Sequence, residues 1–286
     1  MPNLQPIYEI LPPAYRRALE LAGDTALEEL RLRIGHVPTA VRRGNEELLP
    51  LPSGGGLVTA DDLSQVLLAA TRQSCYAANE TLKEGFVTIA GGHRIGVCGT
   101  AVVQDGRVIS MKEVSSVAVR VARQVTFAPQ PLLDVLRGST LIVGPPGCGK
   151  TTLLRGCIAA LSGAGARVGV VDERGELAAC VRGIPQLELG PRTDVVCALG
   201  KQAGILLLLR AMNVHWIAVD EITAPADLEA MQNCSYCGVK LLATAHASGS
   251  EELMKRPLYK RLMEMRLFTR LLVLTADKRW HTEGVE

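Results

Sequence analysis

The run Gly-Pro-Pro-Gly-Cys-Gly-Lys-Thr at residues 144–151 constrains this chain more than any other feature, because it satisfies the pattern G-x-x-x-x-G-K-[S/T] at a single place. Residues 140–143 before it read as a buried strand, and residues 152–161 after it read as a helix. Glycines in such a loop let backbone N–H groups turn toward a phosphate at the helix N-terminus. The sequence therefore predicts a phosphate-binding loop in an alternating α/β domain.

The loop also assigns roles to its own residues. The Lys150 ammonium is expected to contact the β- and γ-phosphates of a nucleotide, and the Thr151 hydroxyl is expected to hold Mg²⁺. We expect the nucleotide-binding set to be Gly144, Pro145, Pro146, Gly147, Cys148, Gly149, Lys150, Thr151 and Thr152.

A second apolar run, residues 215–219, ends in Asp220 and Glu221. Because ligands of open α/β sheets gather at the carboxyl ends of the strands, Asp220 is expected to reach the Mg²⁺ and Glu221 to polarise the attacking water. A strand at 167–171, placed between the loop strand and this one, indicates an ATPase with an extra central strand. No N-K-x-D motif for guanine is present, so ATP and Mg²⁺ are the expected cofactors. A solvent-exposed strand end is the alternative for the two acids.

Two further strand ends carry candidate functional residues. Residues 169–177 end in an acidic run expected to face the nucleotide, in which Glu173 or Glu176 rivals Glu221 as the catalyst. A water-exposed acidic turn is the alternative. That run contains Asp172, Glu173, Arg174 and Glu176. Residues 241–247 end near His246, whose ring could sense the γ-phosphate, report on a neighbouring subunit, or be purely structural.

The chain is predicted to form two domains, with Pro129 and Pro131 marking the linker between them. Residues 131–286 alternate strands and helices as in a parallel sheet, and residues 1–130 read as a smaller α+β domain. The expected strands of the second domain are 140–143, 167–171, 215–219, 240–244 and 271–274. The first domain is expected to contain a helix at 12–21, a strand at 29–34, a loop at 49–56, a helix from the Thr59 cap to residue 70, and short strands from residue 86 with a turn at Asp105-Gly106.

Composition argues against several classes of protein. The net charge is 31 − 29 = +2, and the chain has 3 Phe, 5 Tyr and 2 Trp, which disfavours stacking of single-stranded bases. No apolar run reaches the ~18 residues of a membrane span, and the first residues lack a signal-peptide pattern, so a cytoplasmic protein is expected. Eight scattered cysteines fit a reducing compartment. Cys234 and Cys237 have the spacing of half a zinc site, but packing in a helix is the better interpretation.

Five motifs follow one another along the chain in this order: GPPGCGKTT, DERGE, GPRTDV at 190–195, VDEI and TAHA. Together with ELRLRIG and GGHRIGVCG nearer the N-terminus, they resemble the stage III sporulation protein AA family. That family is similar to the ATPases of type II and type IV secretion and of pilus retraction. Their phosphate loop, acidic box, DE strand and histidine box correspond to residues 144–151, 172–176, 220–221 and 246. After GPRTDV the family continues with a D-G-C-P-K-like run, whereas residues 196–201 here read V-C-A-L-G-K.

The resemblance implies more than the motifs do. It implies a RecA-like core acting as an ATP-hydrolysing motor in a homo-oligomeric, hexameric ring, with membrane proteins of a sporulation complex as partners. It also implies a location at the inner face of the membrane in the mother cell, and arginines from the N-terminal sheet that approach the γ-phosphate, for which Arg94, Arg120 and Arg123 are the candidates. Water-facing arginines are the alternative for each. A nucleic-acid-stimulated ATPase and a nucleotide-dependent scaffold with little turnover remain as rival functions.

Overall fold

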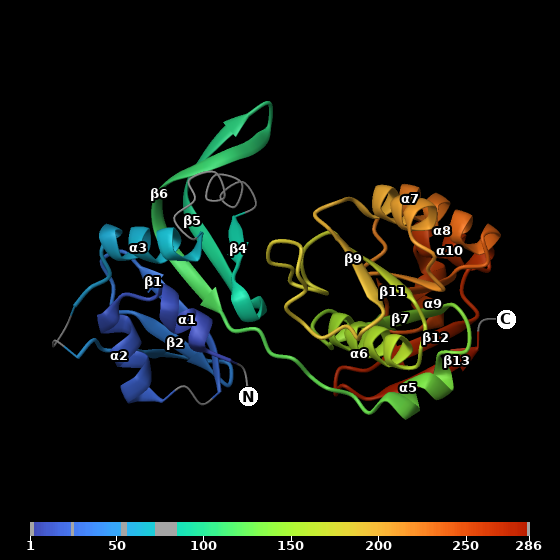
Figure 1. The fold of residues 1–286 in the computed structure, drawn as a ribbon, viewed down its shortest axis with the longest axis horizontal. Helices are drawn as coiled ribbons and strands as arrows, with labels where there is room; N and C mark the ends of the chain where they lie inside the picture. Colours follow the sequence, from blue (N-terminus) through green and yellow to red (C-terminus); the bar gives the residue numbers. More distant parts are fainter. Residues whose placement is uncertain (1–2, 24–25, 53–55, 72–84, 285–286) are drawn as a thin grey trace. The chain divides into compact units, whose positions relative to one another are not determined.

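The computed structural model describes residues 3–23, 26–52, 56–71 and 85–284, and the chain divides into two compact units, Met1–Arg123 and Gln124–Glu286 (Figure 1). Residues 124–130, which the sequence placed in the first domain, belong to the second unit. Within the described residues no helix combines the length and apolar character needed to cross a bilayer.

The first unit is built on an antiparallel sheet whose described strands run in the order β3-β2-β1-β6-β5-β4. Its strands are β1 (Leu27–Arg33), β2 (Thr39–Arg42), β3 (Asn45–Leu48), β4 (Phe86–Thr88), β5 (Arg94–Gln104) and β6 (Arg107–Arg120). Asp105 and Gly106 join β5 to β6 with φ of 50° and 73°, and two positive φ values are what a tight hairpin turn of matching twist requires. The predicted turn is therefore confirmed.

Short helices accompany this sheet: α1 (Gln5–Ile10), α2 (Pro13–Ala22), α3 (Ala60–Ala70) and the 3₁₀ turn η1 (Ala90–Gly92). The predicted cap of α3 is present, because the Thr59 hydroxyl accepts from the Asp62 N–H at 3.2 Å and the Asp62 carboxylate accepts from the Thr59 N–H at 2.8 Å. Leu30 and Leu32 of β1 are fully buried in the core of this unit, whereas Ile34, at the end of the predicted strand, is exposed. The predicted loop at 49–56 lies partly outside the described residues.

His93 is a buried polar residue of the first unit. Its Nδ1 accepts from the Ala122 N–H at 3.0 Å, and its Nε2 lies 2.8 Å from the Asn3 carbonyl oxygen, so the ring links the chain start to the segment after β6. An Nδ1 that accepts and an Nε2 that donates describe the neutral tautomer. Burial lowers the pKa of His93 below its ordinary value.

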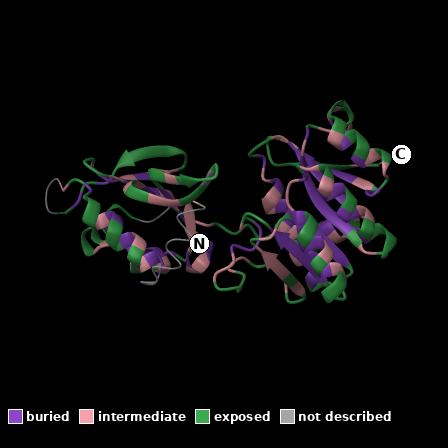
Figure 2. Ribbon diagram, turned by 90° about the horizontal axis from the view of Figure 1, so that it is seen from above, coloured by how far each residue is buried: buried purple, intermediate pink, exposed green. Residues whose placement is uncertain are grey.

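The second unit contains a sheet whose described strands follow the order β13-β12-β7-β11-β10-β8-β9. They are β7 (Thr140–Gly144), β8 (Val168–Asp172), β9 (Thr193–Cys197), β10 (Trp216–Val219), β11 (Lys240–His246), β12 (Arg270–Leu274) and β13 (Trp280–Gly284). Neighbouring strands are parallel except for the β12–β13 pair. Strands β7, β8 and β10 are buried along their whole length, which is typical of parallel strands covered on both faces (Figure 2). The sequence predicted five of these strands and missed β9 and β13.

Helices cover both faces of this sheet. They are α5 (Pro129–Val135), α6 (Lys150–Gly163), α7 (Lys201–Ala211), α8 (Pro225–Tyr236), α9 (Ser250–Lys255) and α10 (Pro257–Glu264). One buried cluster joins the sheet to Leu208 of α7, Met231 of α8 and Leu262 of α10, and another joins it to Leu132 of α5 and Leu154 of α6. The unit is therefore a three-layer α/β/α domain (Figure 1).

The strand order corrects one expectation. The strand between β7 and β10 is β11, whereas β8, which the sequence analysis placed there, lies on the far side of β10. A parallel crossover can add its strand on either side of the preceding one, so order along the chain does not determine order in space. The extra central strand exists, but it is the strand that carries His246 rather than the one that carries Asp172.

Candidate nucleotide-binding site

The loop between β7 and α6 has the backbone that an anion-binding turn requires. Gly147 and Gly149 have φ of 75° and 103°, which L side chains rarely adopt. At Gly144, a Cβ would come within 2.6 Å of the Leu274 carbonyl oxygen. Helix α6 starts at Lys150, so its unpaired N–H groups and the positive end of its dipole lie at the loop. The loop thus fits the phosphate groups of a nucleotide.

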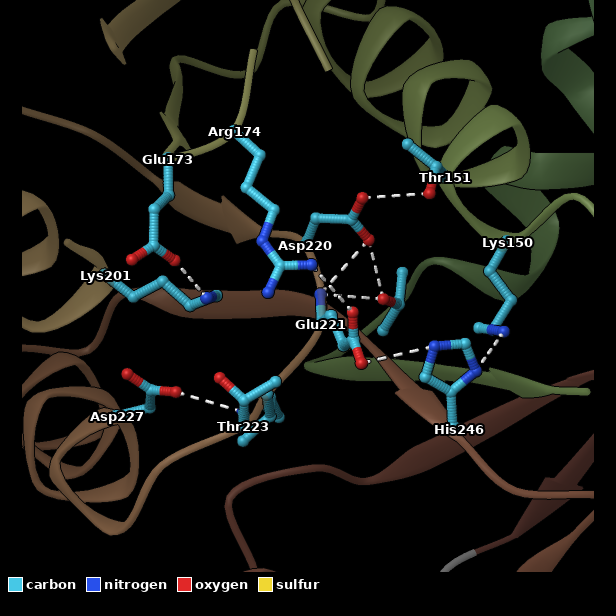
Figure 3. Close-up of polar contacts among 12 residues, drawn as sticks. Lys150, Thr151, Glu173, Arg174, Lys201, Asp220, Glu221, Thr223, Asp227 and His246 are labelled. Atoms are coloured by element: carbon cyan, nitrogen blue, oxygen red, sulfur yellow. Dashed lines mark hydrogen bonds and ion pairs between the residues drawn. The ribbon is translucent and has the colours of Figure 1, made fainter. Parts of the chain in front are cut away.

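Lys150, at the start of α6, is buried at the loop with 6% of its surface exposed. Its Nζ donates to the carbonyl oxygens of Gly144 and Pro145, both at 2.9 Å, and lies 2.9 Å from Nδ1 of His246 (Figure 3). Burial lowers the pKa of Lys150, and the carboxylates of Asp220 and Glu221 act in the opposite direction. The structure therefore brings the loop lysine and His246 together.

Thr151 and Asp220 meet at the edge of the sheet. The Thr151 hydroxyl donates to Oδ2 of Asp220 at 2.9 Å (Figure 3). The Thr244 hydroxyl donates to Oδ1 of Asp220 at 2.7 Å. Hydroxyl and carboxylate oxygens are the ligands that Mg²⁺ prefers. The donor set of Thr151 and Asp220 therefore fits the magnesium ion that the sequence predicted there.

Glu221 follows Asp220 with a left-handed backbone, at φ of 32°. Its N–H lies 2.9 Å from the Thr244 hydroxyl oxygen and 3.1 Å from Oδ1 of Asp220. Its carboxylate, 32% exposed, lies between an imidazole and a guanidinium: Oε1 is 3.2 Å from Nε2 of His246, and Oε2 is 3.6 Å from a guanidinium nitrogen of Arg174. One histidine ring thus contacts both the loop lysine and this glutamate.

The acidic run that begins at the last residue of β8 contains residues with different surroundings. Asp172 is 2% exposed and accepts three backbone N–H groups, from Glu176 at 2.8 Å, Leu177 at 3.1 Å and Ala178 at 2.8 Å. Glu173, by contrast, forms an ion pair with Lys201, the first residue of α7. Asp172 therefore holds the backbone of the loop that follows it, whereas the side chain of Glu173 borders the candidate site.

A shallow hollow lies beside Glu221. It is lined by Val171, Asp172, Glu173, Arg174, Glu176, Lys201, Asp220 and Glu221. The three acids proposed from sequence as the catalyst, Glu173, Glu176 and Glu221, thus border one space. Glu173 is paired with a buried lysine there, whereas Glu221 is paired with the more exposed Arg174 and with His246.

The three candidate arginines lie in the first unit and have partners there. The Arg94 guanidinium lies 3.7 Å from the centre of the Phe86 ring, Nε of Arg120 is 3.5 Å from a Glu29 carboxylate oxygen, and Arg123 donates to the Leu27 carbonyl at 3.0 Å. Their approach to a γ-phosphate stays a prediction.

The structure places the paired cysteines in and after α8. Cys234 is buried and its Sγ lies 3.6 Å from the Ala230 carbonyl oxygen, while Cys237 is exposed. Over the described ranges no group of three or more His, Cys, Asp or Glu side chains is arranged to hold a metal ion. Cys75, one of the eight cysteines, lies outside those ranges.

Sequence reasoning assigned no role to two residues of the site. Thr244 contacts both Asp220 and Glu221, and its signal in the sequence is a hydroxyl between apolar residues of a buried strand. Lys201 pairs with Glu173, and its signal is a charged residue at the start of an apolar helix. Arg174 was noted within the acidic run, but its contact with Glu221 could not be read from spacing.

Two solved structures share this fold. The Legionella pneumophila ATPase DotB matches with a TM-score of 0.62 at 16% identity, over 95% of this chain and 81% of that one. The pilus retraction motor PilT with bound ADP matches with a TM-score of 0.62 at 16% identity, over 93% of this chain and 77% of that one. These likenesses confirm the predicted α/β fold, in which a RecA-like core follows a smaller α+β unit along the chain.

Sequence relationships are closer. Stage III sporulation protein AA of Bacillus subtilis (strain 168) is 38% identical over 285 residues, which cover 95% of this chain and 91% of that protein. Residues 2–284 match the family described as Sporulation stage III, protein AA. The resemblance seen in the motifs is thus confirmed over almost the whole length, and the chain belongs to the Sporulation stage III, protein AA family.

Proposed function

We propose that this protein binds ATP with Mg²⁺ and hydrolyses it as a motor of the secretion-ATPase type. The observation that carries the proposal is the Thr151–Asp220 hydrogen bond at the phosphate loop, with the Glu221 carboxylate beside it. A hydroxyl and a carboxylate that meet beyond a glycine-rich loop are the parts that hold Mg²⁺ against a nucleotide. The fold shared with the ATPase DotB and the motor PilT supports the same conclusion.

Each residue then has a task. The loop N–H groups and Lys150 bind the phosphates, and Thr151 and Asp220 hold the metal ion. Bound MgATP supplies the γ-phosphoryl group that is transferred to water. Glu221 orients the attacking water and takes up its proton through the carboxylate, which His246 and Arg174 hold in place at 3.2 Å and 3.6 Å. Glu173 is tied to Lys201 and is the weaker candidate for this role.

The proposal extends to assembly. Identical subunits form a ring, a hexamer in our proposal, in which Arg94, Arg120 or Arg123 of one subunit approaches the phosphates bound by another. Membrane proteins of a sporulation complex are the proposed partners, and the cytoplasmic face of the mother-cell membrane is the proposed location. The family name supports the link to sporulation, and the motor PilT supports the link to movement.

Phosphate release by the purified full-length chain tests the core of the proposal. The wild type should hydrolyse ATP only with Mg²⁺, and Lys150→Ala should lose binding and turnover while it keeps the wild-type circular dichroism spectrum. Wild-type protein that binds no ATP, or Lys150→Ala protein with full turnover, would contradict it. Stimulation by single-stranded DNA that weakens steeply with salt would favour the nucleic-acid-stimulated alternative instead.

Mixing variants tests the ring. Lys150→Ala protein keeps its arginines, so adding it to an Arg94→Ala, Arg120→Ala or Arg123→Ala variant should restore turnover if one subunit completes the site of another. Native mass measurement with and without MgATP should show the assembly directly. Turnover per subunit that stays constant on dilution, with no recovery in any mixture, would contradict a shared site.

A further inference from the structure

Thr244 is an unusual residue for its position. It lies in the central strand β11, is 1% exposed, and has Leu241, Leu242, Ala243 and Ala245 as its neighbours in the strand. Interior parallel strands are close to continuously apolar, and a buried hydroxyl without partners is costly. A buried hydroxyl at this position must therefore be hydrogen-bonded, and its partners indicate its role.

Three consecutive residues are hydrogen-bonded to Thr244. Its hydroxyl donates to Oδ1 of Asp220 at 2.7 Å and accepts from the Glu221 N–H at 2.9 Å. Its backbone carbonyl accepts from the Ile222 N–H at 3.0 Å. A single residue of β11 thus fixes the chain at the point where it leaves β10.

These bonds determine what the two acids can do. Because Oδ1 of Asp220 is engaged by Thr244, Oδ2 is the oxygen that faces Thr151. Glu221 has a φ of 32°, a conformation that persists only where its surroundings hold it. The bond from its N–H to Thr244 is one such restraint, and it directs the Glu221 side chain toward His246 and Arg174.

We propose that Thr244 is a positioning residue that orients Asp220 for Mg²⁺ and Glu221 for water, an inference that rests on the proposed function. In this proposal Thr244 acts through these two acids. Its hydroxyl selects the carboxylate orientation of Asp220 and holds the left-handed backbone of Glu221.

Three variants separate this role from simple packing. Thr244→Val keeps the branched shape and removes the hydroxyl, and Thr244→Ser keeps the hydroxyl and removes the methyl group. Thr140→Val is the matched control, because Thr140 is equally buried in β7 but donates only to the Gly138 carbonyl. Tryptophan fluorescence melts establish that each variant is folded, and Thr244→Ala replaces the valine variant in every assay if that chain does not fold.

The measurement is the affinity for a fluorescent ATP analogue in EDTA and in Mg²⁺, followed by single-turnover hydrolysis. In EDTA all variants should bind within about twofold of wild type. In Mg²⁺ the valine variant should lose about 10- to 100-fold of the metal-dependent gain in affinity, the range expected for one hydrogen bond to a charged group. The single-turnover rate of the valine variant should fall as its Mg²⁺-dependent gain in affinity falls. Thr244→Ser and Thr140→Val should behave as wild type.

Two results would overturn the inference. One is a valine variant with the full Mg²⁺-dependent gain and wild-type turnover. The other is a valine variant that weakens equally in EDTA and in Mg²⁺, since that pattern describes packing alone. Wild-type protein that fails to bind the analogue in either condition would instead remove the proposed function, and this inference with it, so the wild-type arm distinguishes the two failures.

Discussion

Replacing Asp172 with asparagine tests whether this member of the acidic run supports the fold rather than the chemistry. The carboxylate is 2% exposed and accepts from the N–H groups of Glu176, Leu177 and Ala178. An asparagine side chain has one oxygen and one NH₂ group. Whichever way it is turned, at least one buried N–H then faces a donor instead of an acceptor.

The magnitude follows from these contacts. A hydrogen bond to a charged group contributes about 1.5–3 kcal/mol, and a buried N–H left without an acceptor costs about 1–3 kcal/mol. With one bond lost and the other two weakened by the loss of charge, Asp172→Asn should lower the free energy of unfolding by about 3–5 kcal/mol. For a urea slope of about 2.5 kcal/mol per molar, the unfolding midpoint should fall by roughly 1–2 M.

Tryptophan fluorescence gives a clean assay. The chain has 2 Trp, and both, Trp216 in β10 and Trp280 in β13, lie in the second unit. Urea unfolding followed by this signal therefore reports on the unit that contains Asp172. Asp194→Asn is the matched control, because that aspartate of β9 is exposed and its replacement should change stability by less than about 0.5 kcal/mol.

One result would refute the reasoning. If Asp172→Asn unfolded at the wild-type urea concentration and still lost ATP hydrolysis, the carboxylate would act in the chemistry and the three backbone contacts would be incidental. A stability loss with hydrolysis intact at low urea would establish the structural role.

Three further predictions concern other parts of the molecule. Glu221→Gln should bind MgATP within a few-fold of wild type but hydrolyse it at least about 100-fold more slowly, and a Glu173→Gln enzyme slower than Glu221→Gln would reverse the assignment of the base. Burial lowers the pKa of His93 in the folded state, so as the pH falls His93 is protonated in the unfolded chain before it is protonated in the folded protein. The contribution of neutral His93 to the free energy of unfolding should therefore be full above pH about 6.5 and decrease as the pH falls below that value. His93→Gln should flatten that dependence in unfolding measured by circular dichroism at pH 7.5 and 5.5, and an unchanged slope would contradict it. Gly204→Ala should lower the free energy of unfolding by about 1 kcal/mol in urea unfolding, because a Cβ there would lie 2.5 Å from a Val171 methyl group. The overpacking costs about 1–3 kcal/mol, which exceeds the gain of about 1 kcal/mol from the higher helix propensity of alanine. A variant more stable than wild type would count against this prediction.

The parts of the fold that the sequence predicted well have local causes. The strands 140–143 and 215–219 are apolar runs that end at a glycine loop or a pair of acids, and burial of such runs needs no distant information. The capping box of α3 and the turn at Asp105-Gly106 depend on residues at most three positions apart. The same locality made the phosphate loop and the DE pair recognisable.

The parts that were missed depend on which strands become neighbours. Thr244 and Asp220 are 24 residues apart, and Lys201 and Glu173 are 28 apart. The first contact exists because β11 lies beside β10, and the sequence analysis had placed the strand of residues 167–171 on that side. An error in spatial order therefore hid a site residue, although the strand containing it was predicted.

The position of β11 between β7 and β10 has a consequence for how the candidate site forms during folding. Strands are about 4.8 Å apart, so β7 and β10 are separated by about 9.6 Å, and Thr244 of β11 lies between them and contacts Asp220. A slip of one residue along β11 would turn its side chains to the opposite faces of the sheet. Alanines 243 and 245 would then replace Thr244 and His246, and the hydroxyl and the imidazole would be lost together. We therefore expect the hydroxyl and the imidazole to reach the proposed site together, when β11 pairs in its correct register.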